Sequence, residues 1–229
     1  MNEILSVRNL NKHFTEPEDF HVLKNINFSI QKGEFVSLVG KSGCGKSTLL
    51  YLLSTLDTNY SGEIFIGGEK VSGMKHKALA AFRNEHIGFV FQFHFLLPEF
   101  SALENVMIPA QKAGKFPLSE IKDRAYEKLK LLDMHEHAHK LSSRLSGGQA
   151  QRVAIARALI NEPSIIMGDE PTGNLDSANT QTVFQILKDL SRSGKQTIIT
   201  VTHDSEFAAN CDRIIEMKDG EIIGDERMR

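Results

Sequence analysis

The eight residues from Gly40 to Ser47, GKSGCGKS, constrain the fold of this chain more than any other stretch. They fit the pattern G-x-x-x-x-G-K-[ST], whose backbone N–H groups cradle phosphate when the pattern joins a strand to a helix. The apolar run Phe35–Val39 predicts a buried strand just before it, and Thr48–Leu56 predicts a helix just after it. We therefore expect a phosphate-binding loop between a strand and a helix.

The residue types of this phosphate loop, Gly40–Ser47, suit different tasks. Glycine lets the backbone curl closely round a phosphate because no side chain intervenes. Lys46 is expected to reach the outer phosphates, and the Ser47 hydroxyl to ligate Mg²⁺. Cys44 stands at a variable position, so we expect a packed, inert thiol. The predicted nucleotide-contacting residues here are Gly40, Lys41, Ser42, Gly43, Cys44, Gly45, Lys46, Ser47 and Thr48.

A second stretch suited to phosphate runs from Arg144 to Asp176. Ser146-Gly147-Gly148 is expected to open a helix, because a serine hydroxyl can accept a free backbone N–H at a helix start. The helix Gln149–Asn161 is apolar nearly all round and should be buried. A helix N-terminus favours anions through its free N–H groups and its dipole. This stretch therefore predicts a second element directed at phosphate.

Two acids follow the next apolar run, Ile165–Met167, which reads as a buried strand. We expect Asp169 to hold Mg²⁺, mostly through water, and Glu170 to orient and deprotonate an attacking water. An Asp-Glu pair alone would favour a solvated loop. After three buried apolar residues, and in a chain with a phosphate loop, the catalytic interpretation is favoured.

Two further polar residues stand at predicted strand ends. Gln92 follows the strand Ile87–Phe91, where its amide would touch both Mg²⁺ and the attacking water. His203 follows the strand Thr197–Thr202, where it would hydrogen-bond the γ-phosphate. Single glutamines and histidines are usually structural, so both assignments depend on their context.

The order of predicted elements indicates an α/β fold. Strands and helices alternate on both sides of the chain's middle, which is typical of a core of parallel strands. Between them, the helical stretches Ala102–Lys112 and Leu118–Leu132 interrupt the strand pattern. We predict one domain, residues 1–229, with a core of about 1–92 and 155–229 and an inserted helical subdomain of about 93–154.

Composition excludes several classes of function. The 229 residues are 41% hydrophobic and 24% charged, as in ordinary globular proteins, and the net charge of −2 includes no basic block. Nucleic acid is therefore not an expected partner. We find no secretory signal and no apolar run long enough to span a bilayer. Two cysteines, Cys44 and Cys211, are too few for a disulfide framework and fit a reducing cytosol.

Taken together, the motifs resemble the ATP-binding-cassette ATPases. The matching segments, in the family's order, are Gly40–Ser47, Gln92, Leu145–Gln149, Ile165–Glu170, Asn174–Asp176 and His203. The resemblance implies a P-loop NTPase core of the RecA-like type, with a mainly parallel sheet, an antiparallel β subdomain and an inserted helical subdomain. It also implies ATP and Mg²⁺ as cofactors.

The same resemblance implies a head-to-tail dimer of two copies. Each ATP would lie between the phosphate loop of one copy and the signature turn, Leu145–Gln149, of the other. Ser146, Gly147, Gly148 and Gln149 would then contact the partner's ATP. Asp176 would cross to the partner, and Phe14 would stack on adenine, where the family more often has tyrosine. Phe20 is the weaker candidate for that stacking position.

Two stretches, Gln92–Val106 and Asp169–Asp176, resemble the LolD/MacB/FtsE group of this family. The first stretch, which contains the apolar segment Phe93–Val106, is most similar to the lipoprotein-releasing branch. That similarity implies a peripheral location at the cytoplasmic face of an inner membrane, on LolC/LolE-like permease subunits. The segment is unusually apolar and could receive a short helix of such a permease. The alternative is that its apolar residues simply pack the helical subdomain. A MacB-like exporter and an FtsE-like cell-division or cell-wall regulator also stay open.

Three other interpretations carry less weight. His135, His137 and His139 look like a metal cluster, but we expect a solvated helical face because no carboxylate or cysteine completes a site at ligand spacing. A cassette protein acting on DNA or ribosomes would carry coiled-coil, zinc or basic additions. A non-hydrolysing regulatory subunit would be expected to lose Lys46, Glu170 or His203.

Overall fold

A six-stranded sheet forms the centre of the computed structural model, which describes residues 3–16, 19–193 and 196–228. Its strand order is β10-β9-β3-β8-β7-β6, and every neighbouring pair is parallel except β10 with β9. The strands are β3 (Phe35–Val39), β6 (Ile87–Val90), β7 (Ile165–Asp169), β8 (Thr197–Val201), β9 (Arg213–Lys218) and β10 (Glu221–Arg227). The expected core of parallel strands is confirmed.

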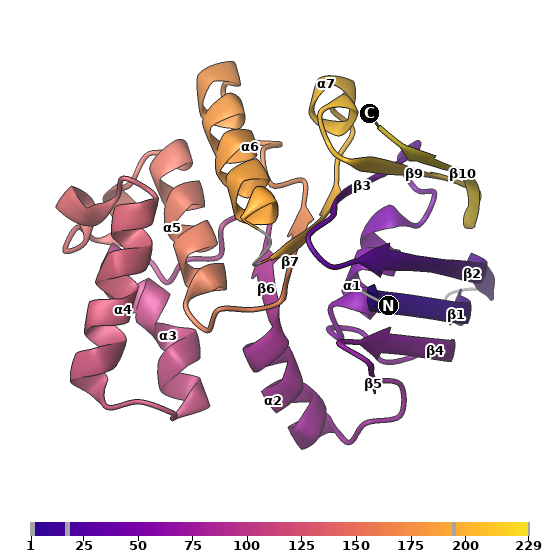
Figure 1. Cartoon of the computed structure of the whole chain (residues 1–229), viewed down its shortest axis with the longest axis horizontal. Coiled ribbons are helices and arrows are strands. Elements are labelled where there is room, and N and C mark those ends of the chain that lie inside the picture. Colours follow the sequence, from indigo (N-terminus) through magenta and orange to yellow (C-terminus); the bar gives the residue numbers. More distant parts are fainter. Residues whose placement is uncertain (1–2, 17–18, 194–195, 229) are drawn as a thin grey trace.

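A second, antiparallel sheet packs beside the first (Figure 1). Its order is β2-β1-β4-β5, with β1 (Glu3–Phe14), β2 (Phe20–Gln31), β4 (Ser61–Ile66) and β5 (Glu69–Lys70). The turn between β4 and β5 uses Gly67 and Gly68, whose φ angles of 60° and 85° suit glycine. These two glycines thus allow a tight hairpin between β4 and β5.

Helix α1 (Lys46–Leu53) lies between the two sheets (Figure 1). Its leucines, including Leu49 and Leu53, share one hydrophobic cluster with residues of both sheets. The helix ends before the predicted Leu56 because Thr55 has a left-handed φ of 61°. The first helix after the phosphate loop is therefore enclosed by the core on both sides.

The opposite face of the parallel sheet is covered by helices. Helices α3 (Ala102–Ala113), α4 (Leu118–Leu131) and α5 (Gly147–Leu159) pack against one another at one end of the molecule (Figure 1). Helices α6 (Ser177–Arg192) and α7 (Ser205–Ala209) complete that layer, which shares a second hydrophobic cluster with β3, β7 and β8. The predicted end of the helical subdomain, at about residue 154, falls within α5, and the division itself stays a prediction.

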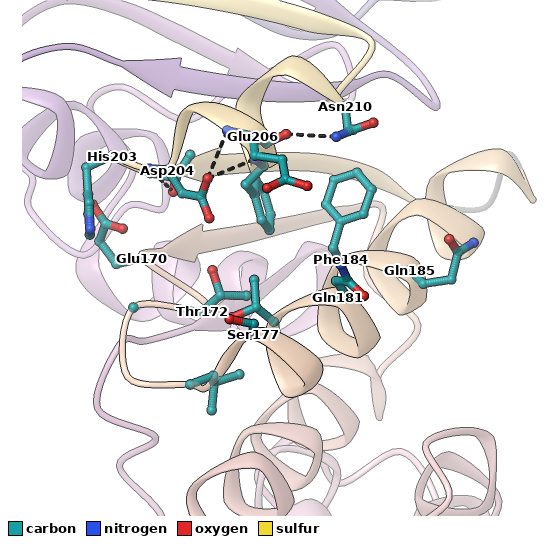
Figure 2. Close-up of a pocket in the computed structure, with 15 residues that line it drawn as sticks. Glu170, Thr172, Ser177, Gln181, Phe184, Gln185, His203, Asp204, Glu206 and Asn210 are labelled. Carbon is teal, nitrogen blue, oxygen red and sulfur yellow. Dashed lines mark hydrogen bonds and ion pairs between the residues drawn. The ribbon is translucent and has the colours of Figure 1, made fainter.

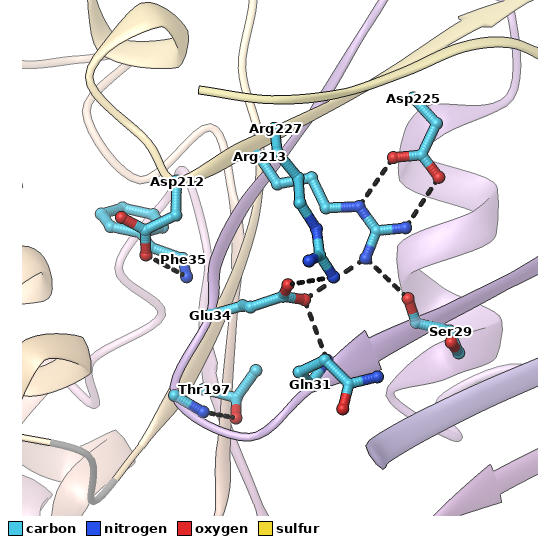
Figure 3. Close-up of polar contacts among 10 residues, drawn as sticks. Ser29, Gln31, Glu34, Phe35, Thr197, Asp212, Arg213, Asp225 and Arg227 are labelled. Atoms are coloured by element: carbon cyan, nitrogen blue, oxygen red, sulfur yellow. Dashed lines mark hydrogen bonds and ion pairs between the residues drawn. The ribbon is translucent and has the colours of Figure 1, made fainter. Parts of the chain in front are cut away.

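A buried arginine, Arg213, forms hydrogen bonds with residues of both sheets (Figure 3). Arg213 donates two hydrogen bonds of 2.7 Å to Asp225 and one of 2.7 Å to the carbonyl of Ser29 in β2. It also lies 3.3 Å from Glu34, which forms an ion pair with Arg227. These bonds raise the pKa of Arg213 and lower the pKa of Asp225. The cluster joins the β9–β10 hairpin to the antiparallel sheet.

One helix was not expected from the sequence. Helix α2 (His76–His86) precedes β6, yet it buries only Leu79 and has no side-chain cap at Lys75. An apolar face this narrow produces no clear helical periodicity. The strand that follows also ends at Val90, one residue before the predicted end at Phe91.

Candidate functional site

The phosphate loop is shaped by close backbone contacts that only glycine permits. Gly40 has a φ of 147°, and a Cβ there would lie 2.2 Å from the carbonyl oxygen of Met217. Gly45, with a φ of 102°, caps α1, and a Cβ there would lie 2.8 Å from Leu23. The loop therefore lies against β9 and β2 at two points, as a short link from β3 into α1.

Lys46 lies across its own loop. Its side chain is buried, and Nζ donates hydrogen bonds to the carbonyl oxygens of Gly40, at 2.8 Å, and Lys41, at 3.0 Å. A buried ammonium group needs such partners, and a phosphate would supply stronger ones. The lysine is thus already inside the loop that would hold an anion.

A cavity of about 320 Å³ opens beside the loop. Its lining joins the loop to residues from the ends of β7 and β8, namely Val22, Gly40, Ser42, Gly43, Gly45, Lys46, Ser47, Thr48, Glu170, Val201 and His203. Lys41 and Cys44 are outside this lining, and Cys44 is buried beneath the loop, with its N–H 3.3 Å from the Lys41 oxygen. The structure thus brings Lys46, Glu170 and His203 to one cavity.

Asp169 ends β7 and is held by two hydroxyl groups from α1. Ser47 donates to Oδ1 and Tyr51 donates to Oδ2, both at 2.9 Å. Burial and the bond to Asp169 together raise the pKa of Tyr51 to about 12. Sequence reasoning missed Tyr51, although it lies four residues after Ser47 and so on the same helical face. The hydroxyl and carboxylate oxygens at this point are the donor types that Mg²⁺ prefers.

Glu170 and His203 face each other at the strand ends (Figure 2). Glu170 Oε1 lies 2.9 Å from His203 Nδ1, and the carboxylate is mostly buried while the imidazole is exposed. Glu170 has a left-handed φ of 48°, held by its N–H bond of 3.0 Å to the Val201 carbonyl. A strained backbone at a non-glycine residue is typical of functional positions.

Gln92 lies just beyond β6, near Glu170. Asn174 donates a hydrogen bond of 3.1 Å to the Gln92 carbonyl. A Cβ placed on Gly173 would lie 3.1 Å from the Gln92 amide nitrogen and 3.4 Å from Glu170 Cβ. The predicted neighbourhood of Gln92 and Glu170 is therefore present, with Gly173 between them.

A larger hollow of about 540 Å³ adjoins the first and shares Glu170 and His203 with it (Figure 2). Its other walls come from α6 and α7, including Gln181 and Phe184. Asp204 starts α7 by accepting N–H bonds from Glu206 and Phe207. The predicted catalytic pair thus stands at the boundary of two cavities, one of which belongs to the phosphate loop.

The signature turn lies elsewhere, at the start of α5. Ser146 caps the helix in a reciprocal capping box with Gln149, as its hydroxyl was predicted to do. None of the residues Ser146 to Gln149 is in the described lining of the phosphate-loop cavity. A Cβ on Gly148 would lie 2.3 Å from Asn179 Oδ1, and Asn179 also donates to the Asp176 carboxylate at 2.8 Å. Asp176 therefore caps α6 beside the signature turn.

The expectation of a solvated histidine face is wrong for His137. Residues His135–His137 form a short 3-10 helix, so these histidines do not lie along an α-helical face. His137 Nε2 lies 3.0 Å from the side-chain nitrogen of Gln149. This contact spans twelve residues and has no local sequence signal.

The apolar segment after Gln92 divides into exposed and buried residues. Phe93 and Phe95 are both 64% exposed, whereas Leu103 and Val106 are buried in the helical cluster. The packing alternative therefore holds for the two residues in α3, and the two phenylalanines stay free of the core. Whether they receive a partner stays a prediction.

Two side chains connect this segment to α5. Arg157 donates hydrogen bonds of 2.7 Å to the carbonyl oxygens of His94 and Phe95. Burial lowers the pKa of His94, the charge of Arg157 lowers it further, and a backbone hydrogen bond with Gly147 partly opposes both. Arg157 thus links the segment after Gln92 to the last turn of α5.

Phe14 lies at the end of β1, directly opposite Phe20 in β2. Both rings are exposed, Phe14 by 45% and Phe20 by 59%, and Lys12 Nζ lies 5.0 Å from the Phe14 ring centroid. Phe14 is outside the described lining of the phosphate-loop cavity. An exposed aromatic ring is available for stacking, but its assignment to adenine stays a prediction.

The family model described as "ABC transporter" matches residues 23–173. The chain is 54% identical to a protein of Bacteroides fragilis over 202 residues, which are 88% of this chain and 93% of that protein. It is 47% identical to a protein of Aquifex aeolicus over 225 residues, 98% of each chain. Both relatives are named lipoprotein-releasing system ATP-binding protein LolD.

Solved structures give the same family. The dimeric post-hydrolysis structure of the ATP-binding cassette MJ0796, bound to ADP and Pi, is 41% identical and superposes with a TM-score of 0.91 over 99% of both chains. The cbiO1 subunit of the cbiONQ transporter of Clostridium perfringens, 32% identical, has a TM-score of 0.89 over 99% of this chain and 89% of that one. Among the described residues, no helix combines the length and apolar character needed to cross a membrane.

Proposed function

The chain belongs to the ABC transporter family, and from this premise we propose that it drives the release of lipoproteins from an inner membrane. It is an ATPase of that family and binds ATP. The observation that carries the ATP-driven part of the proposal is the cavity where the phosphate loop, Glu170 and His203 meet. The cargo is inferred from the names of the relatives, which are lipoprotein-releasing ATP-binding proteins.

We assign the chemistry to residues of the cavity. Backbone N–H groups of Gly43 and Gly45 and the Lys46 ammonium hold the β- and γ-phosphates. Glu170 takes a proton from the attacking water, whose oxygen bonds to the γ-phosphorus as the bond to the β-phosphate oxygen breaks. ADP and phosphate are the products. His203 hydrogen-bonds the γ-phosphate and, through its contact with Glu170, orients that carboxylate.

We assign the metal position to Ser47, Asp169 and Gln92. The Ser47 hydroxyl and the Asp169 carboxylate are within hydrogen-bonding distance of each other, so both can face one cation. When bound, Mg²⁺ would neutralise charge that builds up between the β- and γ-phosphates. Tyr51 would keep the Asp169 carboxylate in one orientation through its bond to Oδ2.

The second half of each ATP site is proposed to come from another copy of this chain. Ser146, Gly147, Gly148 and Gln149 stand outside the phosphate-loop cavity, which supports a role on a partner's ATP. The solved relative MJ0796 is a dimer. Phe14 would stack on adenine in its own copy, and Asp176 would face the partner.

Membrane subunits are the second proposed partner. The exposed rings of Phe93 and Phe95 flank His94, and Arg157 of α5 bonds the carbonyl oxygens of His94 and Phe95. Helix α5 begins at the signature turn, so it connects this segment with that turn. A permease of the LolC/LolE type would dock on the segment Phe93–Val106, at the cytoplasmic face of the membrane. A movement of the docked permease would then be transmitted through the helical subdomain, about residues 93–154, to the partner's ATP.

The direct test reconstitutes the chain with the membrane proteins that co-purify with it from detergent-solubilised membranes. Vesicles carrying a fluorescent acylated lipoprotein are mixed with ATP and an acceptor protein, and release is measured by sedimentation. We expect release with the wild-type chain and at most background release with Glu170→Gln. Co-purification of an exporter or a cell-division membrane protein, with no lipoprotein release, would favour the MacB-like or FtsE-like alternative.

A further inference from the structure

The signature turn is held by a hydrogen-bonded glutamine. The N–H of Ser146 donates to Gln149 Oε1 at 3.1 Å, and the N–H of Gln149 donates to Ser146 Oγ at 3.3 Å. This reciprocal arrangement satisfies two of the donors that a helix start leaves free. The side-chain nitrogen of Gln149 is left to find an acceptor outside the turn.

His137 supplies that acceptor. Its Nε2 atom lies 3.0 Å from the Gln149 amide nitrogen. An amide nitrogen only donates, and the amide oxygen is already used by Ser146, so the network assigns an unprotonated Nε2 to His137. The histidine therefore completes a chain of three hydrogen bonds that begins at the signature serine.

The backbone around His137 is itself fixed by α3. The His137 carbonyl accepts a bond of 2.9 Å from the N–H of Lys140, and the Ala138 carbonyl accepts one of 2.9 Å from the N–H of Leu103. Ala138 is fully buried in the helical cluster. The imidazole thus stands on a rigid support, and its bond restricts the side chain of Gln149.

We propose that His137 is a positioning residue for the half-site that this chain offers to a partner's ATP. Its bond keeps Gln149 in the capping box, and the capping box aims the N–H groups of Gly147 and Gly148 away from α5. The inference rests on the proposed function, because it assumes that the signature turn completes a partner's site. It adds a residue from outside every motif of the chain.

The neighbouring histidines offer a matched comparison. His139 is exposed, two residues away on the same segment. His135 is half-buried, and its Nδ1 atom is without a hydrogen-bond partner among the described residues. Loss of His139 should therefore leave the signature turn intact, whereas loss of His137 should release Gln149.

The test uses the full chain carrying Glu170→Gln, which should form a stable dimer with ATP. Light scattering gives the ATP concentration for half-maximal dimer, and a fluorescent ATP analogue gives affinity in the monomer. We expect His137→Leu to raise the dimerisation midpoint about tenfold, because a net hydrogen bond is lost at each of two sites. Monomer affinity should change less than about twofold, because the phosphate loop is untouched.

A conservative variant separates positioning from general damage. His137→Gln keeps an acceptor at similar reach and should return the midpoint to within about twofold of the parent. His139→Leu should leave the midpoint unchanged. The proposal is overturned if His137→Leu dimerises like its parent, or if a folded His137→Gln fails to restore dimerisation.

Failure of the proposed function would look different. If the Glu170→Gln parent stays monomeric at saturating ATP, this result contradicts the proposed ATP-bound dimer. Hydrogen exchange at the Gln149 backbone N–H in the monomer still decides the role of His137. We expect exchange about threefold to tenfold faster in His137→Leu and normal exchange in His137→Gln, and equal protection in all three proteins would reject the positioning role.

Discussion

The molecule presents two elements directed at phosphate, and it supports them in opposite ways. The phosphate loop is enclosed: Gly40 and Gly45 touch the backbone or side chains of other strands, and Lys46 is buried. The signature turn is exposed at Ser146 and Gly147 and is held by side-chain hydrogen bonds. The first depends on the whole core, and the second depends on a few polar contacts that single substitutions can remove.

This difference fits a division of labour. An enclosed loop can select and hold ATP before any partner arrives, since its geometry is already formed. In the proposed dimer, the exposed turn would meet the partner's ATP only after two copies approach. Substitutions on the two sides should therefore separate binding of ATP from closure of the dimer.

The largest effect is expected from Glu170→Gln. Loss of the general base should lower the ATPase rate by about 10²–10⁴-fold while ATP still binds. Steady-state phosphate release and equilibrium ATP binding measure the two quantities. Glu206→Gln, an exposed neighbour on α7, is the matched control. A Glu170→Gln chain that hydrolyses ATP at the wild-type rate would show that another group is the base.

The second-largest effect is expected from Lys46→Ala, which should weaken ATP binding by the monomer, a step that precedes dimerisation. Removing charge-assisted bonds to phosphate is expected to weaken ATP binding by the monomer about 10- to 100-fold. Isothermal titration of the isolated chain measures this. Lys32→Ala, in the exposed turn before β3, should bind ATP normally. Undiminished binding by Lys46→Ala would remove the lysine from the predicted phosphate contacts.

Ser146→Ala examines the other side of the comparison. Loss of the N-cap should cost about 1 kcal/mol of unfolding free energy and lower Tm by about 2–4 °C. ATPase activity should fall about tenfold, because both half-sites of a dimer lose their cap, while monomer ATP affinity stays the same. Calorimetry and ATPase assays measure these changes. Ser143→Ala, exposed and three residues earlier, is the control, and weakened monomer binding in Ser146→Ala would contradict the separation of the two sides.

The smallest effect is expected from Tyr51→Phe. The variant removes only the hydroxyl that donates to Asp169 Oδ2, so affinity for Mn²⁺ in the presence of nucleotide should fall about threefold. Electron paramagnetic resonance of Mn²⁺ gives the affinity without a turnover assay. Tyr60→Phe removes a hydroxyl bonded to Ser72 instead and should leave the metal affinity unchanged. Equal affinities in wild type and Tyr51→Phe would show that Ser47 alone orients Asp169.

The enclosed side could be predicted from the sequence largely because its determinants are local. The phosphate loop, the strand before it and the helix after it occupy one continuous stretch. On the exposed side, the Ser146 cap of α5 was predictable for the same reason, because a helix cap depends on residues close together in the sequence. The position of Tyr51 could also have been predicted, because it follows Ser47 by four residues and so lies on the same face of α1.

The contacts that sequence reasoning missed are of another kind. His137 reaches Gln149 through a 3-10 turn, and its support comes from hydrogen bonds to α3, so no local pattern predicts it. Helix α2 was missed because burial of Leu79 alone leaves no periodicity. The Arg213 cluster joins residues nearly two hundred positions apart, at Ser29 and Asp225. These features arise from tertiary packing, which a single sequence encodes only indirectly.

The contacts of Asn179 couple the start of α5 to the start of α6. The Asn179 amide is bonded to Asp176 and fills the space beside Gly148, where a side chain would overlap it. The first turns of α5 and α6 are therefore packed closely against each other through Gly148 and Asn179. A rotation of the signature turn that pushes Gly148 against Asn179 would therefore also displace Asp176, to which Asn179 is bonded.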